Sequence, residues 1–157
     1  MSYHAGHKWT DFDFPKLGWK ASRLYGWILP GRQHQFVLFI DYCLRHPITN
    51  PEFNQYELVP AELIFENVIG LKINLDMDSY SELDIVNIER INNRPSPNGK
   101  ITLWDYTVSL SREGSISFTS TGFTQTTLSE PVITDNFDLD RETEFLRQLR
   151  EKGPKKL

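Results

Sequence analysis

The chain has one cysteine, few basic residues and no long apolar run. Cys43 has no second cysteine with which to form an intrachain disulfide. The 17 Lys and Arg residues are outnumbered by 21 Asp and Glu residues, for a formal net charge of −4, whereas nucleic-acid binding needs clustered basic residues that displace counterions from phosphates. No segment reaches the roughly 20 apolar residues of a membrane-spanning helix, and the N-terminus lacks the apolar centre of a signal peptide. We therefore expect a cytoplasmic protein that binds neither nucleic acid nor membranes.

The rest of the composition is typical of one globular domain. The 157 residues are 39% hydrophobic and 13% aromatic, which suffices for one substantial core, and the length is short for two domains. We expect a single domain over residues 1–157, with a core from about residue 19 to residue 150 and flexible ends at residues 1–10 and 153–157.

Alternation of polar and apolar residues predicts a hairpin between residues 103 and 121. Its inward side chains should be Trp104, Tyr106, Val108, Leu110, Ile116 and Phe118. The alternation then breaks, because Phe123 is apolar where the pattern requires a polar residue. Gly122 stands just before this break, and a glycine inside a strand pattern predicts a β-bulge.

Further strands are predicted at residues 22–29, 36–44, 59–68, 70–76 and 83–91. Residues 36–44 are apolar on both faces, as in a central strand, Pro60 should stand at the start of its strand, and Asn98-Gly99 predicts a tight turn. Residues 138–153 are acidic at the start and basic at the end, which is typical of a helix. The predicted fold is mainly β, an antiparallel sandwich or partly open barrel of about seven strands with a C-terminal helix.

Two motifs could be taken for metal sites, and neither is complete. His4 and His7 lie near a terminus without the third and fourth ligands that a stable zinc site needs. Residues 76–87 begin like a calcium loop at Asp76, but the sixth position is Ser81 rather than Gly and the twelfth is Asn87 rather than Glu. We expect no metal and no cofactor.

The central strand holds two reactive side chains, Asp41 and Cys43. A cysteine nucleophile would need an oriented histidine base, but His34 and His46 merely flank the strand, in loops where we expect them to be exposed. Cys43 is therefore expected to be a small buried hydrophobic residue. A carboxylate in an apolar run must accept hydrogen bonds, pair with a cation or have a raised pKa. The favoured interpretation is that Asp41 is a structural residue whose carboxylate binds backbone groups or an arginine. The alternative is that Asp41 belongs to a functional site. Enzymatic activity is not favoured.

Several segments together resemble an uncharacterised bacterial family. They are IDYCLRH, VPAELIFENVIGLKINLD, LDIVNIER and ISFTSTGFTQTTLSEPV, and the family pattern is Trp-His-Asp, an Asp-x-Asp-Tyr strand, PATLVFENV and ISFEATGFTQ. The chain is also distantly similar to Imm50-type immunity proteins. Where the family has His-Asp this chain has Lys20-Ala21, and Phe39 replaces the first acid of the Asp-x-Asp-Tyr strand. The resemblance implies a fold, and it leaves only Asp41 of any site built from His and two acids.

Two functions remain open. The first is a non-catalytic module that binds a protein partner, as the resemblance to immunity proteins implies, and its acidic charge would attract a basic partner. Its candidate surface is a nearly uncharged, exposed face formed by Thr107, Ser109, Ser117, Thr119 and Thr121, although β-propensity alone also explains these residues. The second is a small-molecule-binding protein or hydrolase. Its pocket would be lined by Trp19, Tyr25, Trp27, Asp41 and Tyr42, although core packing also explains these aromatic residues.

Overall fold

The computed structural model describes residues 3–47, 52–76 and 82–135, which form ten strands and two short 3₁₀ segments. The elements are β1 (Lys8–Thr10), η1 (Asp11–Lys16), β2 (Ser22–Ile28), β3 (Phe36–Arg45), β4 (Tyr56–Glu66), β5 (Ile69–Asn74), β6 (Leu83–Pro95), β7 (Thr102–Leu110), η2 (Ser111–Glu113), β8 (Ser115–Ser120), β9 (Gly122–Thr127) and β10 (Val132–Thr134). The described residues include no helix with the length and apolar content needed to cross a membrane.

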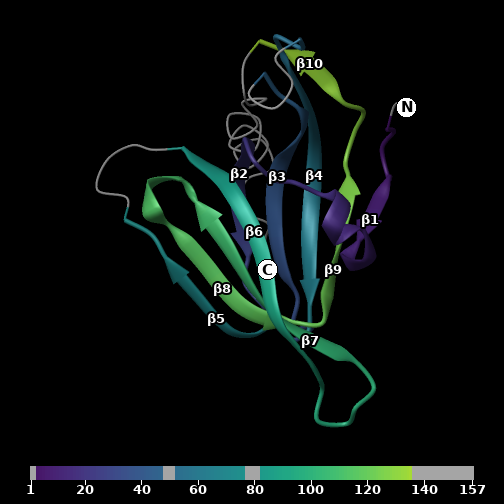
Figure 1. Cartoon of the computed structure of the whole chain (residues 1–157), viewed down its shortest axis with the longest axis vertical. Coiled ribbons are helices and arrows are strands. Elements are labelled where there is room, and N and C mark those ends of the chain that lie inside the picture. The colour runs from purple at the N-terminus through teal and green to yellow at the C-terminus, as the bar shows by residue number, and fades with distance from the viewer. Residues whose placement is uncertain (1–2, 48–51, 77–81, 136–157) are drawn as a thin grey trace, which may run out of the picture.

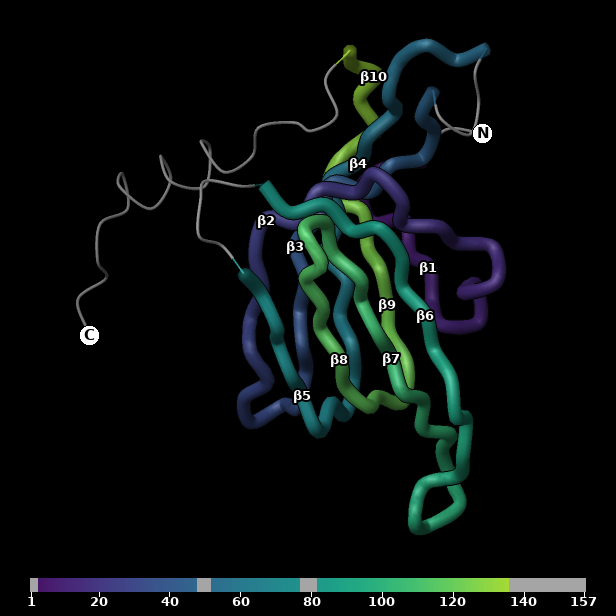
Figure 2. Tube along the Cα trace, turned by 60° about the vertical axis from the view of Figure 1, so that its left-hand side comes forward, coloured from purple at the N-terminus to yellow at the C-terminus, as the bar shows by residue number. Residues whose placement is uncertain are grey.

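All ten strands belong to one open antiparallel sheet. The strand order is β1-β9-β4-β3-β2-β6-β7-β8-β5, and β10 pairs with β4 beside this path. The sheet bends over itself, so that β6, β7, β8 and β5 lie over β2, β3, β4 and β9 (Figure 1 and Figure 2). The mainly-β, antiparallel prediction is confirmed. The strand count exceeds seven because residues 114–128 form two strands and because β1 and β10 are short additions, and the predicted helix at residues 138–153 lies outside the described residues.

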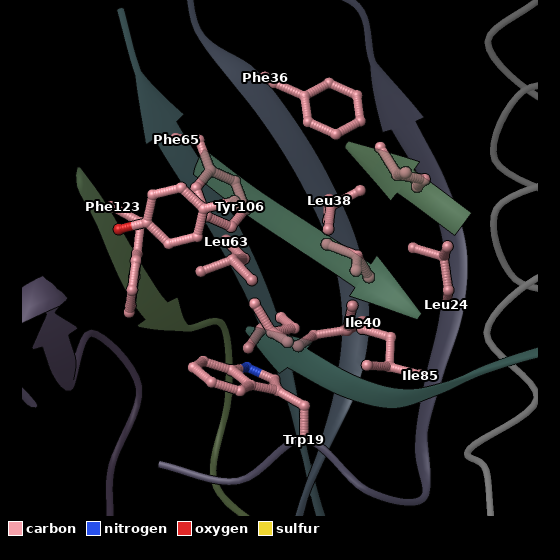
Figure 3. Close-up of a cluster of buried hydrophobic side chains, with 14 of the residues drawn as sticks. Trp19, Leu24, Phe36, Leu38, Ile40, Leu63, Phe65, Ile85, Tyr106 and Phe123 are labelled. Atoms are coloured by element: carbon pink, nitrogen blue, oxygen red, sulfur yellow. The ribbon is translucent and has the colours of Figure 1, made fainter. Parts of the chain in front are cut away.

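The core fills the space between the two halves of the sheet. Figure 3 shows large side chains from both halves meeting there, among them Phe65 of β4 and Tyr106 of β7. The Phe65 ring centroid lies 5.1 Å from that of Tyr106 and 4.6 Å from that of Phe118 on β8, which is the range of favourable aromatic pairs. The core also includes Trp9 of β1, which is 8% exposed. It therefore begins earlier in the chain than the predicted start near residue 19.

The predicted hairpin of residues 103–121 forms as β7 and β8. Thr107 lies opposite Ser117 and Val108 lies opposite Ile116, and the predicted inward residues are in or against the core. Strand β3 is buried on both faces along most of its length, as predicted for a central strand. The Asn98-Gly99 pair lies in the turn between β6 and β7, where Gly99 has a φ of +71°.

Gly122 does not form a bulge within one strand, as the sequence predicted. It begins β9, at the point where the chain leaves β8 in one half of the sheet and joins β4 in the other. Its φ of +148° is rarely adopted by other residues, and a Cβ atom there would lie 2.8 Å from the Asp11 carboxyl carbon. The change of face at Phe123 therefore marks a corner between the two halves.

Pro60 lies inside β4 rather than at its start. Its carbonyl accepts a hydrogen bond from the Leu128 amide, so its nitrogen faces the same side of the strand. On that side β10 pairs with residues 56–58 and β9 pairs with residues 61–66. The missing N–H of proline therefore falls in the gap between two neighbouring strands, where no ladder hydrogen bond is lost.

Candidate functional site

The segment η1 packs beside β1 and β9 and presents three different faces. A 3₁₀ helix has three residues per turn, so residues three positions apart share a face. Phe14 packs against the core, whereas Phe12 and Pro15 line one groove and Asp13 and Lys16 line another. The two grooves therefore flank η1 and depend on its position.

The position of η1 is fixed by its first residues and by Phe14. The Thr10 hydroxyl accepts a hydrogen bond from the Phe12 amide, and the Asp13 carboxylate accepts one from the Thr10 amide at 2.9 Å, which is a capping box. The Phe14 ring centroid lies 5.7 Å from that of Trp19 and 6.2 Å from that of Phe123. Phe14 thus holds η1 against two core side chains, one nearby in sequence and one more than 100 residues away.

The first groove, called here the hairpin groove, has a volume of about 560 Å³ and lies between η1 and the part of the β6–β7 hairpin near its turn. It is lined by Asp11, Phe12, Pro15, Arg90, Asn93, Ile101, Thr102, Trp104 and Thr121. The Arg90 guanidinium carbon lies 4.1 Å from the Trp104 ring centroid and 4.3 Å from the Phe14 ring centroid, so two cation–π contacts hold it in place. Beside it, the Phe12 side chain is 88% exposed.

The second groove, called here the aromatic groove, has a volume of about 440 Å³. It is lined by Tyr3, His7, Lys8, Trp9, Asp13, Lys16, Leu17, Tyr42 and Leu44. Trp9 and Tyr42 are buried, whereas Lys8 and Lys16 are exposed. The Tyr42 hydroxyl accepts a hydrogen bond from the Gly18 amide at 3.3 Å, and burial, only partly offset by this bond, raises the pKa of Tyr42 to about 12.

The predicted Ser/Thr surface is half-buried, and charged residues border it. Thr107 lies between Ser117 of β8 and Glu89 of β6, and Lys72 of β5 lies opposite Ser117. The Thr119 hydroxyl donates a hydrogen bond to the Asp105 carboxylate at 2.8 Å. Hydrogen bonds from Asn92, the larger effect, and from Thr119 lower the pKa of Asp105. The surface is therefore not the exposed, nearly uncharged face that the hairpin sequence predicted, because the flanking strands add Glu89 and Lys72.

The members of that predicted surface also separate in space. Ser109 is half-buried opposite Ser115 on the same face of the hairpin as Thr107. Thr121 instead follows the end of β8, where its amide donates to the Glu66 carbonyl at 3.2 Å. Of the predicted surface residues, Thr121 lines the hairpin groove.

The predicted pocket residues do not share one cavity. Asp41 and Tyr42 are neighbours on β3 and point to opposite faces of the sheet. Tyr42 lies on the core side, where its ring centroid is 6.3 Å from that of Trp19, and Trp27 also packs against the core. Tyr25 lies with Asp41 on the other face. Tyr42 alone of the five lines the aromatic groove.

Asp41 is fully buried and accepts a hydrogen bond from the Tyr25 hydroxyl. It lies in register opposite Arg23 of β2, which is 3% exposed. Arg23 forms ion pairs with Asp84 at 2.8 Å and with Glu82 at 3.0 Å. The surroundings of Asp41 thus supply a hydrogen-bond donor and a nearby cation, which a buried carboxylate requires.

Cys43 and the histidines beside its strand do not form a nucleophile and base pair. The Cys43 thiol donates to the Arg45 carbonyl, and its burial raises the pKa of Cys43 to about 12, so it stays protonated at neutral pH. His34 is exposed as predicted, but His46 is 6% exposed rather than exposed, and burial lowers its pKa. Within residues 3–47, 52–76 and 82–135, no three His, Cys, Asp or Glu side chains are grouped to hold a metal.

Sequence reasoning missed Phe12, Trp9 and Trp104 as groove residues. The segment WTDFDFP places Phe12 and Phe14 two residues apart, which is the spacing of a strand. The signal that could have identified η1 is the Thr10-x-x-Asp13 spacing of a capping box, followed by Pro15. Comparison of the chain with family models, with curated proteins and with solved structures gave no match.

Proposed function

We propose that this protein is a non-catalytic module that binds a protein partner through Phe12 and the hairpin groove. The observation that carries the proposal is the 88% exposure of Phe12 beside Trp104 and Arg90. Covering a fully exposed phenylalanine recovers about 1.5–3 kcal/mol of hydrophobic free energy. Aromatic residues and arginine are enriched in interfaces, and Trp and Arg are frequent among the residues that dominate binding energy.

The local structure also favours binding, because Phe12 is already held in place. The capping box fixes the start of η1 and Phe14 anchors it in the core. Arg90 is likewise fixed between two rings. A preorganised surface loses less conformational entropy when a partner covers it.

The two reactive side chains of β3 support a non-catalytic role. Asp41 is 0% exposed and hydrogen-bonded to Tyr25, and a catalytic group must reach its substrate. Cys43 carries a buried thiol whose pKa is raised to about 12. The net charge of −4 favours encounters with a positively charged partner.

The test is a comparison of single variants in a binding assay. The immobilised full chain is exposed to proteins of its host, and retained proteins are identified by mass spectrometry. Phe12→Ala removes the exposed ring. Ile133→Ala is a matched control, because the Ile133 side chain is 52% exposed and its strand β10 lies far from the β6–β7 hairpin (Figure 1). Both variants should melt at the native temperature, because exposed side chains contribute little to stability.

We expect a partner that the native chain and the Ile133→Ala variant retain and that the Phe12→Ala variant loses. If Phe12 is a dominant interface residue, Phe12→Ala should raise the dissociation constant roughly thirtyfold. Equal retention by all three chains would contradict the assignment of the surface. If the retained protein is a toxin encoded beside this chain, the immunity-type role implied by the sequence resemblance gains support.

A further inference from the structure

The aromatic groove has a continuous row of four rings. The ring centroids of Trp9 and Tyr42 are 5.4 Å apart, that of His7 is 4.6 Å from Trp9, and that of Tyr3 is 4.7 Å from His7. Trp9 and Tyr42 are buried, while Tyr3 and His7 are half-buried. The row therefore runs from the core toward the surface, where its outer rings can make aromatic contacts with a planar ligand.

Two lysines, Lys8 and Lys16, are among the residues that line this groove. Lys8 and Lys16 are exposed, and neither has an ion-pair partner among the residues that the structure describes. The lining includes one carboxylate, that of Asp13, which already accepts the hydrogen bond from the Thr10 amide. The groove is thus locally basic in a chain of net charge −4, and this local charge favours an anion.

The groove also offers hydrogen-bond donors. The Tyr42 oxygen accepts from the Gly18 amide, but its own proton has no acceptor in the described part of the chain. Its pKa of about 12 keeps that proton in place at neutral pH. The His7 ring contacts Tyr3 and Trp9, and no hydrogen bond to its ring nitrogens occurs within the described residues. These groups match a ligand that presents acceptors.

We propose that the aromatic groove binds a small organic anion that carries a planar aromatic ring, with its ring against this row of aromatic side chains and its charge toward Lys8 and Lys16. The volume of about 440 Å³ lies within the range of roughly 300–1,000 Å³ of small-molecule sites. A phosphate and a carboxylate share the required charge. The groove is distinct from the hairpin groove, so this site does not depend on the protein partner.

The test is isothermal titration calorimetry of the full chain with four probes. Adenosine monophosphate and indole-3-acetate carry a ring and a charge, adenosine carries a ring without a charge, and ribose 5-phosphate carries a charge without an aromatic ring. We expect at least one of the first two to bind roughly tenfold more tightly than both adenosine and ribose 5-phosphate. Tighter binding of adenosine monophosphate would identify phosphate as the anionic group, and tighter binding of indole-3-acetate would identify carboxylate.

Variants then locate the site. Lys8→Gln combined with Lys16→Gln should weaken binding of the charged ring roughly tenfold, because two partly exposed ion contacts are lost. Lys100→Gln is the matched control, an exposed lysine in the β6–β7 turn outside the groove. The proposal is overturned if no probe gives saturable binding, if adenosine binds as tightly as its monophosphate and indole-3-acetate does not bind, or if the double variant binds like the control.

Discussion

Replacement of Asp41 by alanine should destabilise the protein although Asp41 lies outside both grooves. The side chain is 0% exposed and accepts a hydrogen bond from the Tyr25 hydroxyl. A hydrogen bond to a charged group contributes about 1.5–3 kcal/mol, and removing the acceptor leaves the Tyr25 hydroxyl without this partner. Arg23 loses the negative charge opposite it but keeps Asp84 and Glu82. We expect the free energy of unfolding to fall by about 2–3 kcal/mol and the melting temperature by roughly 4–12 °C.

Urea unfolding followed by tryptophan fluorescence measures this change. The midpoint should fall while the slope stays the same, because the surface exposed on unfolding is nearly unaltered. Tyr25→Phe is the matched variant, since it removes the donor and keeps the carboxylate. In the double variant the two losses should not add, because both single variants break the same hydrogen bond. The structural role of Asp41 would be refuted if Asp41→Ala had the same urea midpoint as the native chain. It would also be refuted if the stability losses of the two single variants added fully in the double variant.

Three further predictions follow from burial and strand register. Cys43, whose pKa burial raises to about 12, should not react with Ellman's reagent at pH 8 in the native protein and should react fully in urea; fast native reaction would contradict its burial. The pKa of Tyr42 rises from 10.0 in the unfolded chain to about 12 in the folded protein. Its protonated hydroxyl therefore adds about 2–3 kcal/mol to the free energy of unfolding below pH 10, and this contribution is lost as the pH rises to 12. Urea unfolding at pH 9 and pH 11 tests this, and a pH dependence as large in Tyr42→Phe as in the native chain would count against it. Thr107→Lys should change stability by less than about 0.5 kcal/mol, because half-buried Thr107 lies on the face away from the core, opposite Glu89. Unfolding of this variant would show that the strand faces are assigned wrongly.

Strand faces could be predicted from the sequence because they depend on local alternation. Val108 and Ile116 both alternate with polar neighbours, and both are fully buried. The partners of a strand depend on residues far away, so the alternation around Thr107 does not reveal that Glu89 and Lys72 border its face. For the same reason the sequence pattern predicts a bulge at Gly122, which in the structure is the corner between the two halves of the sheet.

The grooves could not be predicted from local pattern, since each is assembled from distant segments. The hairpin groove combines η1 with Arg90 and Trp104 of the β6–β7 hairpin, and the aromatic groove combines residues 3–17 with Tyr42 of β3. The sequence predicted a pocket that includes Trp19 and Tyr42, and the ring centroids of these two residues lie 6.3 Å apart. The predicted pocket also includes Asp41, although alternation along β3 places the Asp41 side chain on the face opposite to that of Tyr42.

The pairing of β1 with β9 sets the time during synthesis at which β1 can join the sheet. His7 and Thr127 are hydrogen-bonded across 120 positions of sequence. At about 5–20 residues per second, a ribosome needs roughly 6–24 s to make that length of chain. Until then β1 has no strand with which to pair, and such distant pairings also slow folding. A nascent chain that ends before Gly122 therefore lacks the strand that pairs with β1 and contacts η1, so the segment between the two grooves is fully held in place only after β9 has been made.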